Sequence, residues 1–148
     1  MSSNKPFKIC FVCLGNICRS PLAQGVFEFL ISKTNYKNLV QIESAGTGSW
    51  HVGNPPDKRM QATARKNGII LNSLARQFKP EDFNRLDLVI PMDRSNLNDL
   101  SILCSPSTAQ EKLRLFRSFD PENISTKSLD VPDPYYGGDG GFDNVFEI

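Results

Sequence analysis

The feature that most constrains the fold is a mostly apolar run, Phe7 to Val12, that passes through a tight loop directly into a helix signal. A short run rich in β-branched and aromatic residues is typical of a strand buried on both faces. After the loop, Ser20 suits the N-cap and Pro21 the first turn of a helix. Apolar residues at three- and four-residue steps extend this helix to about Lys33. A strand, a loop and a helix in this order predict the first unit of a parallel α/β sheet.

The same alternation continues along the chain. Further strands are predicted at Val40 to Ser44, Leu86 to Met92 and Leu113 to Phe116. Helices are predicted from Asp57 to Asn67, ended by Gly68, and from Asp93 to about Cys104, with the long loop 45–56 before the first of them. A last helix begins near Phe142, and the chain stops before it is complete, so this helix is expected to be truncated. We therefore predict an α/β fold with a central four-stranded parallel sheet, covered by helices on both faces.

Length and composition narrow the class of protein. The 148 residues suit a single domain over 1–148, and 39% hydrophobic residues with a mean hydropathy of -0.32 suit a globular chain. A net charge of +1 gives no reason to expect nucleic acid or an anionic membrane as a partner. The longest apolar run is far below the roughly 18 residues of a transmembrane helix, and the polar N-terminus lacks a secretory signal. We expect a cytoplasmic monomer with reduced thiols.

The loop after the first strand predicts an anion site. Its backbone N–H groups and the helix N-terminus would converge on one point, which favours a phosphate group. Cys13 would be the nucleophile, its thiolate favoured by these N–H groups. Arg19 would grip two phosphate oxygens with its forked guanidinium. Ser20 is expected to donate its hydroxyl to the Cys13 sulfur. The nucleotide P-loop pattern Gly-x4-Gly-Lys-Ser/Thr is absent from the sequence.

Four motifs lie in order along almost the whole chain. They are Val12-Cys13-Leu14-Gly15-Asn16-Ile17-Cys18-Arg19-Ser20-Pro21, Ser44-Ala45-Gly46-Thr47, Met92-Asp93-x-Ser95-Asn96-Leu97 and Asp133-Pro134-Tyr135-Tyr136. Together they resemble the low molecular weight protein tyrosine phosphatases. The resemblance implies a flavodoxin-like three-layer fold and hydrolysis of phosphotyrosine or small aryl phosphates through a cysteinyl-phosphate intermediate. It implies no cofactor and no metal.

The resemblance also implies roles for individual residues. The nucleophile falls on Cys13, the phosphate-gripping arginine on Arg19 and the general acid and base on Asp133. Asp133 lies in a segment with five acidic residues and no Lys or Arg, which favours its protonated form. The implied phosphate-binding residues are Leu14, Gly15, Asn16, Ile17, Cys18, Arg19 and Ser20.

Further implied roles concern the surroundings of the loop. Asn16 takes a left-handed conformation and anchors the loop with Ser20 and Ser44, while Asp93 lies near the loop. Cys18 is implied as the partner of a reversible protective disulfide with Cys13. The aromatic walls of the substrate cleft fall on Trp50, Tyr135 and Tyr136. His51, the only histidine, is expected to be an exposed polar residue and not a metal ligand.

Two departures from the family pattern stand out. Ser73 occupies the place of a histidine that hydrogen-bonds the loop asparagine, so a weaker or water-bridged anchor for Asn16 is expected. The second departure is the expected truncation of the C-terminal helix. The missing part of that helix would leave apolar surface exposed.

Three rival functions are considered. Cys10 and Cys13 match Cys-x-x-Cys, but residues three apart in a strand point to opposite faces, roughly 10 Å apart, which argues against a thiol oxidoreductase. An arsenate reductase needs two further cysteines in a separate segment, and only Cys104 is left. A non-catalytic phosphotyrosine-binding module is the third, against which the intact Cys13, Arg19 and Asp133 speak.

Overall fold

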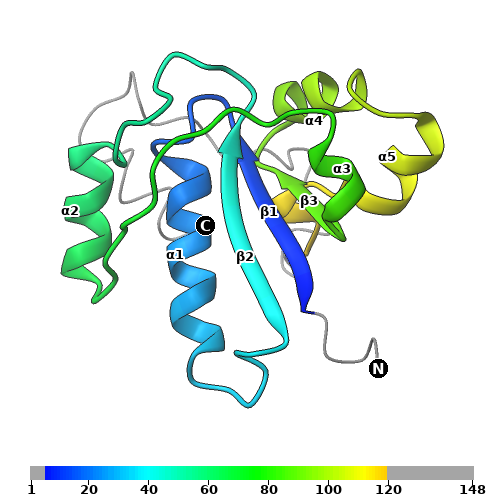
Figure 1. Cartoon of the computed structure of the whole chain (residues 1–148). Coiled ribbons are helices and arrows are strands. Elements are labelled where there is room, and N and C mark those ends of the chain that lie inside the picture. Colours follow the sequence, from blue (N-terminus) through cyan, green and yellow to red (C-terminus); the bar gives the residue numbers. More distant parts are fainter. Residues whose placement is uncertain (1–5, 120–148) are drawn as a thin grey trace.

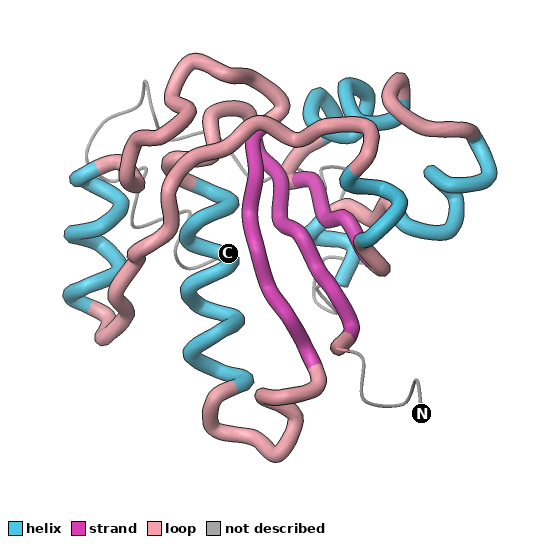
Figure 2. Tube along the Cα trace, in the orientation of Figure 1, coloured by secondary structure: helices cyan, strands magenta, loops and turns pink. Residues whose placement is uncertain are grey.

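The computed structural model describes residues 6–119. Within them a parallel sheet of three strands has the order β2-β1-β3, with β1 at Phe7–Cys13, β2 at Val40–Gly46 and β3 at Leu88–Pro91. Figure 2 shows the three strands side by side. The last residue of β1, Cys13, pairs with Gly46 at the end of β2. Because the strands are parallel, the segments that leave them meet at one edge of the sheet.

Helices cover both faces of this sheet (Figure 1). On one side lie α1, Arg19–Ile31, and α2, Lys58–Lys66. On the other lie α3, Asp82–Arg85, α4, Arg94–Ser101, and α5, Pro106–Lys112. A 3-10 helix, Phe116–Phe119, follows. The α/β class with a parallel sheet is confirmed. None of the helices described between residues 6 and 119 has the length and apolarity needed to cross a bilayer.

Alternate residues of β1 pack into two separate hydrophobic cores. Ile9, Phe11 and Cys13 pack with the α1 and α2 side, whereas Cys10 and Val12 pack with the other. Phe11 contacts the Phe27 ring of α1 at a centroid distance of 6.0 Å. This alternation explains why the run is mostly apolar, since both faces of the strand are buried from Ile9 to Cys13.

The first helix begins two residues earlier than predicted and has a different N-cap residue. Cys18, not Ser20, is the N-cap residue, and it makes no side-chain capping bond. Ser20 lies inside the first turn, fully buried, and its hydroxyl is used by the loop before the helix. Pro21 is still tolerated, because the first-turn N–H groups of a helix have no partner within it.

The predicted fourth strand at 113–116 is reduced to one isolated bridge, between Leu113 and Val89. Arg114 N–H donates to the Val89 carbonyl at 3.2 Å. In a parallel ladder the next donor from β3 to this segment would be residue 91, which is Pro91 and has no N–H. The ladder therefore stops after this bridge. The prediction of a four-stranded sheet is wrong for the described part of the chain. The helix predicted from Phe142 lies outside the described residues.

Candidate active site

The loop between β1 and α1 is fixed by its carbonyl groups. Thr47 N–H donates to Cys13 O at 2.9 Å and Gly48 N–H to Leu14 O at 2.9 Å, so the segment after β2 holds the start of the loop. Asp57, the N-cap of α2, donates its N–H to Ile17 O at 2.7 Å. These carbonyl groups therefore bind two other segments of the chain, and the two segments set the curvature of the loop. An anion loop needs this kind of support, because its N–H groups must keep their direction.

Cys13 lies at the centre of this loop with 2% of its surface exposed. Its Sγ lies 3.0 Å from the Ser20 Oγ, a distance at which either atom can donate. Asn16 N–H donates to the same sulfur at 3.3 Å. The Cys13 sulfur therefore lies within hydrogen-bonding distance of a hydroxyl and of a main-chain N–H.

Asn16 is a buried hub for the loop. Its φ of 59° is in the left-handed region, which asparagine tolerates better than most residues. Its Nδ2 donates to Ser20 Oγ at 2.8 Å and to Ser44 Oγ at 3.0 Å. Its Oδ1 accepts the main-chain N–H of Arg76 at 3.0 Å. Both ends of the amide are therefore used.

Ser44 extends this hub into α1. Its hydroxyl donates to Gln24 Oε1 at 2.7 Å while its oxygen accepts from Asn16. Ser73 is half-buried, and the acceptor atom of the Asn16 amide is filled by the Arg76 N–H. The role of Arg76 was missed by sequence reasoning, because a main-chain donor 60 positions away leaves no local pattern.

Arg19 and Asp93 form an ion pair in which the arginine is buried. Arg19 is 3% exposed, and its Nη1 lies 2.6 Å from Asp93 Oδ2. The other carboxylate oxygen of Asp93 accepts Asn96 N–H at 2.7 Å, so Asp93 caps α4 as predicted and holds the arginine at once. The guanidinium is thereby fixed at the start of α1, next to the thiol loop in sequence and space. A buried guanidinium held in one orientation is suited to gripping an anion.

The remaining candidate residues lie outside the loop between β1 and α1. Trp50 is 72% exposed in the loop that follows β2, where a ring from outside can reach it. A methyl group on Gly15 would lie 3.0 Å from His51 Cδ2, so His51 lies against the loop between β1 and α1. It is half-buried, contrary to the exposed position expected. Asp133, Tyr135 and Tyr136 lie outside the described residues.

None of the four cysteines forms a disulfide. Cys10 and Cys13 belong to cores on opposite faces of the sheet, so the Cys-x-x-Cys pair does not meet. Burial raises the pKa of the Cys10 thiol well above its usual range, although the nearby Arg76 opposes this rise. Cys18 is buried within the same loop as Cys13. In the part of the chain from 6 to 119, no three His, Cys, Asp or Glu side chains come together to hold a metal ion.

The fold and this site together define a class: α/β proteins in which the loop from a buried strand to a helix carries a buried cysteine and a buried arginine. Comparison with known families makes the assignment narrower. The family model "Low molecular weight phosphotyrosine protein phosphatase" matches residues 8–148. The chain therefore belongs to this family and is a phosphatase.

Individual relatives agree with this assignment. The chain is 44% identical to a low molecular weight protein-tyrosine-phosphatase of Streptomyces coelicolor, covering 96% of this chain and 86% of the relative. It is 40% identical to the human low molecular weight phosphotyrosine protein phosphatase, covering 99% and 91%. A crystal structure of a protein tyrosine phosphatase from Entamoeba histolytica, with Hepes in its active site, superposes with a TM-score of 0.87 at 35% identity, covering 95% and 88%.

Proposed function

We propose that the chain hydrolyses phosphotyrosine in proteins, and small aryl phosphates, through a phosphate covalently bound to Cys13. The observation that carries this proposal is the surroundings of the sulfur: a hydroxyl at 3.0 Å, a main-chain N–H at 3.3 Å and a buried arginine six residues on. A buried structural cysteine has no need of two polar neighbours on its sulfur.

In the first step the Cys13 thiolate attacks phosphorus, the bond from phosphorus to the phenolic oxygen breaks, and that oxygen takes a proton from Asp133. Arg19 and the loop N–H groups stabilise the charge on the three remaining phosphate oxygens. The 2.6 Å contact with Asp93 supports this role, because it keeps the guanidinium in one orientation throughout.

In the second step water attacks the cysteinyl phosphate, and the bond between sulfur and phosphorus breaks. Asp133, now a carboxylate, accepts the proton of the attacking water. The sulfur leaves as a thiolate, and the Ser20 hydroxyl is close enough to donate to it as its charge develops. Phosphate and the starting enzyme are the products, with Asp133 protonated again.

Preference for an aryl substrate would come from the cleft walls. Trp50 offers an exposed ring on which a phenol can stack, and Tyr135 and Tyr136 are proposed as the other walls. A deep aromatic cleft favours phosphotyrosine, whose phosphate lies further from the main chain than that of phosphoserine.

Cys18 is proposed as a protective partner for Cys13. Loss of two electrons to peroxide would join the two sulfurs in a disulfide and release water. Both thiols belong to one short loop, which supports the pairing. Brief peroxide treatment should inactivate the enzyme until a thiol reductant is added; a Cys18→Ser variant that recovers equally well would contradict this role.

The first experiment is hydrolysis of para-nitrophenyl phosphate without added metal, over a pH series. The native chain is compared with Cys13→Ser and Asp133→Ala, and a phosphotyrosine peptide with its phosphoserine counterpart. We expect no turnover from Cys13→Ser, and loss of the basic-side pH dependence in Asp133→Ala. A folded native chain that binds inorganic phosphate without turnover would overturn the enzymatic proposal in favour of a binding module.

A further inference from the structure

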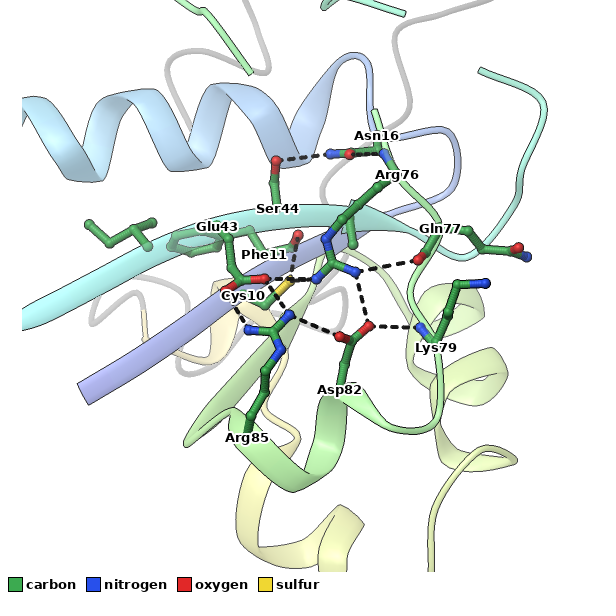
Figure 3. A network of polar contacts seen from close by, with 12 residues as sticks. Cys10, Phe11, Asn16, Glu43, Ser44, Arg76, Gln77, Lys79, Asp82 and Arg85 are labelled. Carbon is green, nitrogen blue, oxygen red and sulfur yellow. Dashed lines mark hydrogen bonds and ion pairs between the residues drawn. The ribbon is translucent and has the colours of Figure 1, made fainter. Parts of the chain in front are cut away.

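Two arginines and two carboxylates form an ion network on the face of the sheet away from Ser44 (Figure 3). Arg76 reaches two carboxylates: its Nη2 lies 2.8 Å from Glu43 Oε1 of β2, and its Nη1 lies 2.9 Å from Asp82 Oδ2 of α3. Arg85 reaches the same two carboxylates, at 2.7 Å from Glu43 Oε2 and 2.9 Å from Asp82 Oδ1. Each carboxylate is thus held by two arginines, and the group is neutral overall.

The charges in this network are mutually stabilised. Hydrogen bonds from Arg85 lower the pKa of Glu43, with Arg76 adding to the effect. Burial alone would raise the pKa of Asp82, but the N–H of Lys79 and the side chain of Arg76 outweigh it and lower that pKa. At neutral pH both carboxylates are therefore ionised, and the side chain of Arg76 is held at two points.

The main chain of Arg76 is part of the catalytic loop's support. Its N–H is the donor to Asn16 Oδ1 at 3.0 Å, and its carbonyl accepts Gly46 N–H at 2.8 Å. Gly46 ends β2 and forms an isolated parallel bridge with Gln77. One residue therefore joins the ion network on one side of the sheet to the Asn16 hub on the other.

The main chain around Arg76 is held by separate hydrogen bonds: Gly46 N–H donates to Arg76 O, Ala75 N–H donates to Asn54 O, and Phe78 N–H donates to Gly46 O. Residues 69–76 form neither helix nor strand, so no regular ladder fixes their main chain. The side-chain contacts with Glu43, at 2.8 Å, and with Asp82, at 2.9 Å, add ties from Arg76 to β2 and α3. Loosening them would let the Arg76 N–H move relative to Asn16.

We propose that Arg76 is a positioning residue for the phosphate-binding loop: its ion pairs with Glu43 and Asp82 fix the main-chain N–H that holds Asn16 in its left-handed conformation. The proposal rests on the proposed function, since it assumes that this loop binds phosphate. Adjacent residues of β2 then hold Asn16 from the two faces of the sheet. Ser44 does so directly, and Glu43 does so through Arg76.

Arg85 provides a matched control. Arg76→Ala and Arg85→Ala each remove one guanidinium from the same two carboxylates, but only Arg76 touches the loop. For both variants we would measure kcat and KM for para-nitrophenyl phosphate, the inhibition constant of inorganic phosphate, and the melting temperature. Hydrogen exchange of the peptide covering residues 14–18 reports the loop itself, without requiring activity.

We expect Arg76→Ala to lower kcat and to weaken phosphate inhibition, each by about tenfold, because a small displacement of preorganised N–H groups has effects of this size or more. Arg85→Ala should stay within about twofold of the native values, and only Arg76→Ala should speed exchange of the loop. Arg76→Lys should restore part of the activity, since an ammonium reaches one carboxylate where the guanidinium reaches two.

Equal effects of Arg76→Ala and Arg85→Ala on loop exchange and on phosphate inhibition would overturn the positioning role, whatever their melting temperatures. Failure of the proposed function looks different: the native chain itself would neither turn over substrate nor bind phosphate. In that case the exchange of residues 14–18 in the two variants still decides whether Arg76 positions the loop.

Discussion

At the scale of single residues, the loop between β1 and α1 depends on Gly46, which has no room for a side chain. A methyl group there would lie 2.7 Å from Leu14 O and 3.1 Å from Asn16 N, both main-chain atoms of the loop. These atoms cannot move without moving the N–H groups that would bind phosphate. We therefore expect Gly46→Ala to lower kcat/KM for para-nitrophenyl phosphate by on the order of a hundredfold, measured beside the melting temperature.

Gly53 is the control for this substitution. Its φ is +87°, but a methyl group would meet nothing within 4 Å, so Gly53→Ala adds backbone strain of about 1 kcal/mol without touching the loop. Its melting temperature should fall while kcat/KM stays near the native value. Native kcat/KM in Gly46→Ala would contradict the tight contact between β2 and the loop.

Residues whose partners are near in sequence could be predicted. Cys13 and Ser20 are seven positions apart, and their contact follows from a loop that curls around one point. Arg76 and Glu43 are 33 positions apart and meet only because an irregular segment passes over β2. No periodicity or spacing encodes that meeting, which is why the ion network was absent from the sequence interpretation.

At the scale of elements, the N-cap of α2 joins helix stability to the site. The Asp57 carboxylate accepts Arg59 N–H at 2.8 Å, and the Asp57 N–H holds Ile17 O. Asp57→Ala should lower the free energy of unfolding by about 1 kcal/mol, because the first turn loses its acceptor. Urea unfolding of Asp57→Ala and Asp57→Asn tests this.

The amide of Asp57→Asn can still cap the helix, so that variant should keep most of its stability. Ser105 caps α5 in the same way, but α5 buries none of its residues, so Ser105→Ala should cost less than Asp57→Ala. Equal unfolding free energies for the native chain and Asp57→Ala would show that α2 does not depend on its cap.

Two Ser-Pro pairs show how far an element signal can be trusted. Ser105 and Pro106 are the N-cap and the first residue of α5, the positions that a Ser-Pro pair favours. The sequence analysis nevertheless missed this short helix. Ser20 and Pro21 carry the same signal, but the helix begins before them because the Ser20 hydroxyl is taken by Cys13 and Asn16. A capping signal therefore gives the place of a helix, and the functional loop decides its first residue.

At the scale of the whole molecule, the free energy of unfolding depends on pH, because folding lowers the pKa values of three carboxylates. Hydrogen bonds from Arg85 lower the pKa of Glu43; for Asp57 and Asp82, hydrogen bonds outweigh the opposing effect of burial. In the unfolded chain these groups titrate near about 4, so the unfolded state takes up protons first as the pH falls. Stability should be full above about pH 5 and fall steadily below it, through the lower pKa values of the folded state.

Urea unfolding at pH 7, 5, 4 and 3 measures this dependence. Glu43→Gln removes one of the three titrating groups, so its stability should start lower at pH 7 and decline less between pH 5 and 3. The arginines of the network stay charged throughout this range, because the pKa values of Arg76 and Arg85 are raised further by their carboxylate partners. A native chain equally stable at pH 7 and pH 3, or a Glu43→Gln variant with the native slope, would mean that these carboxylates gain nothing from their folded surroundings.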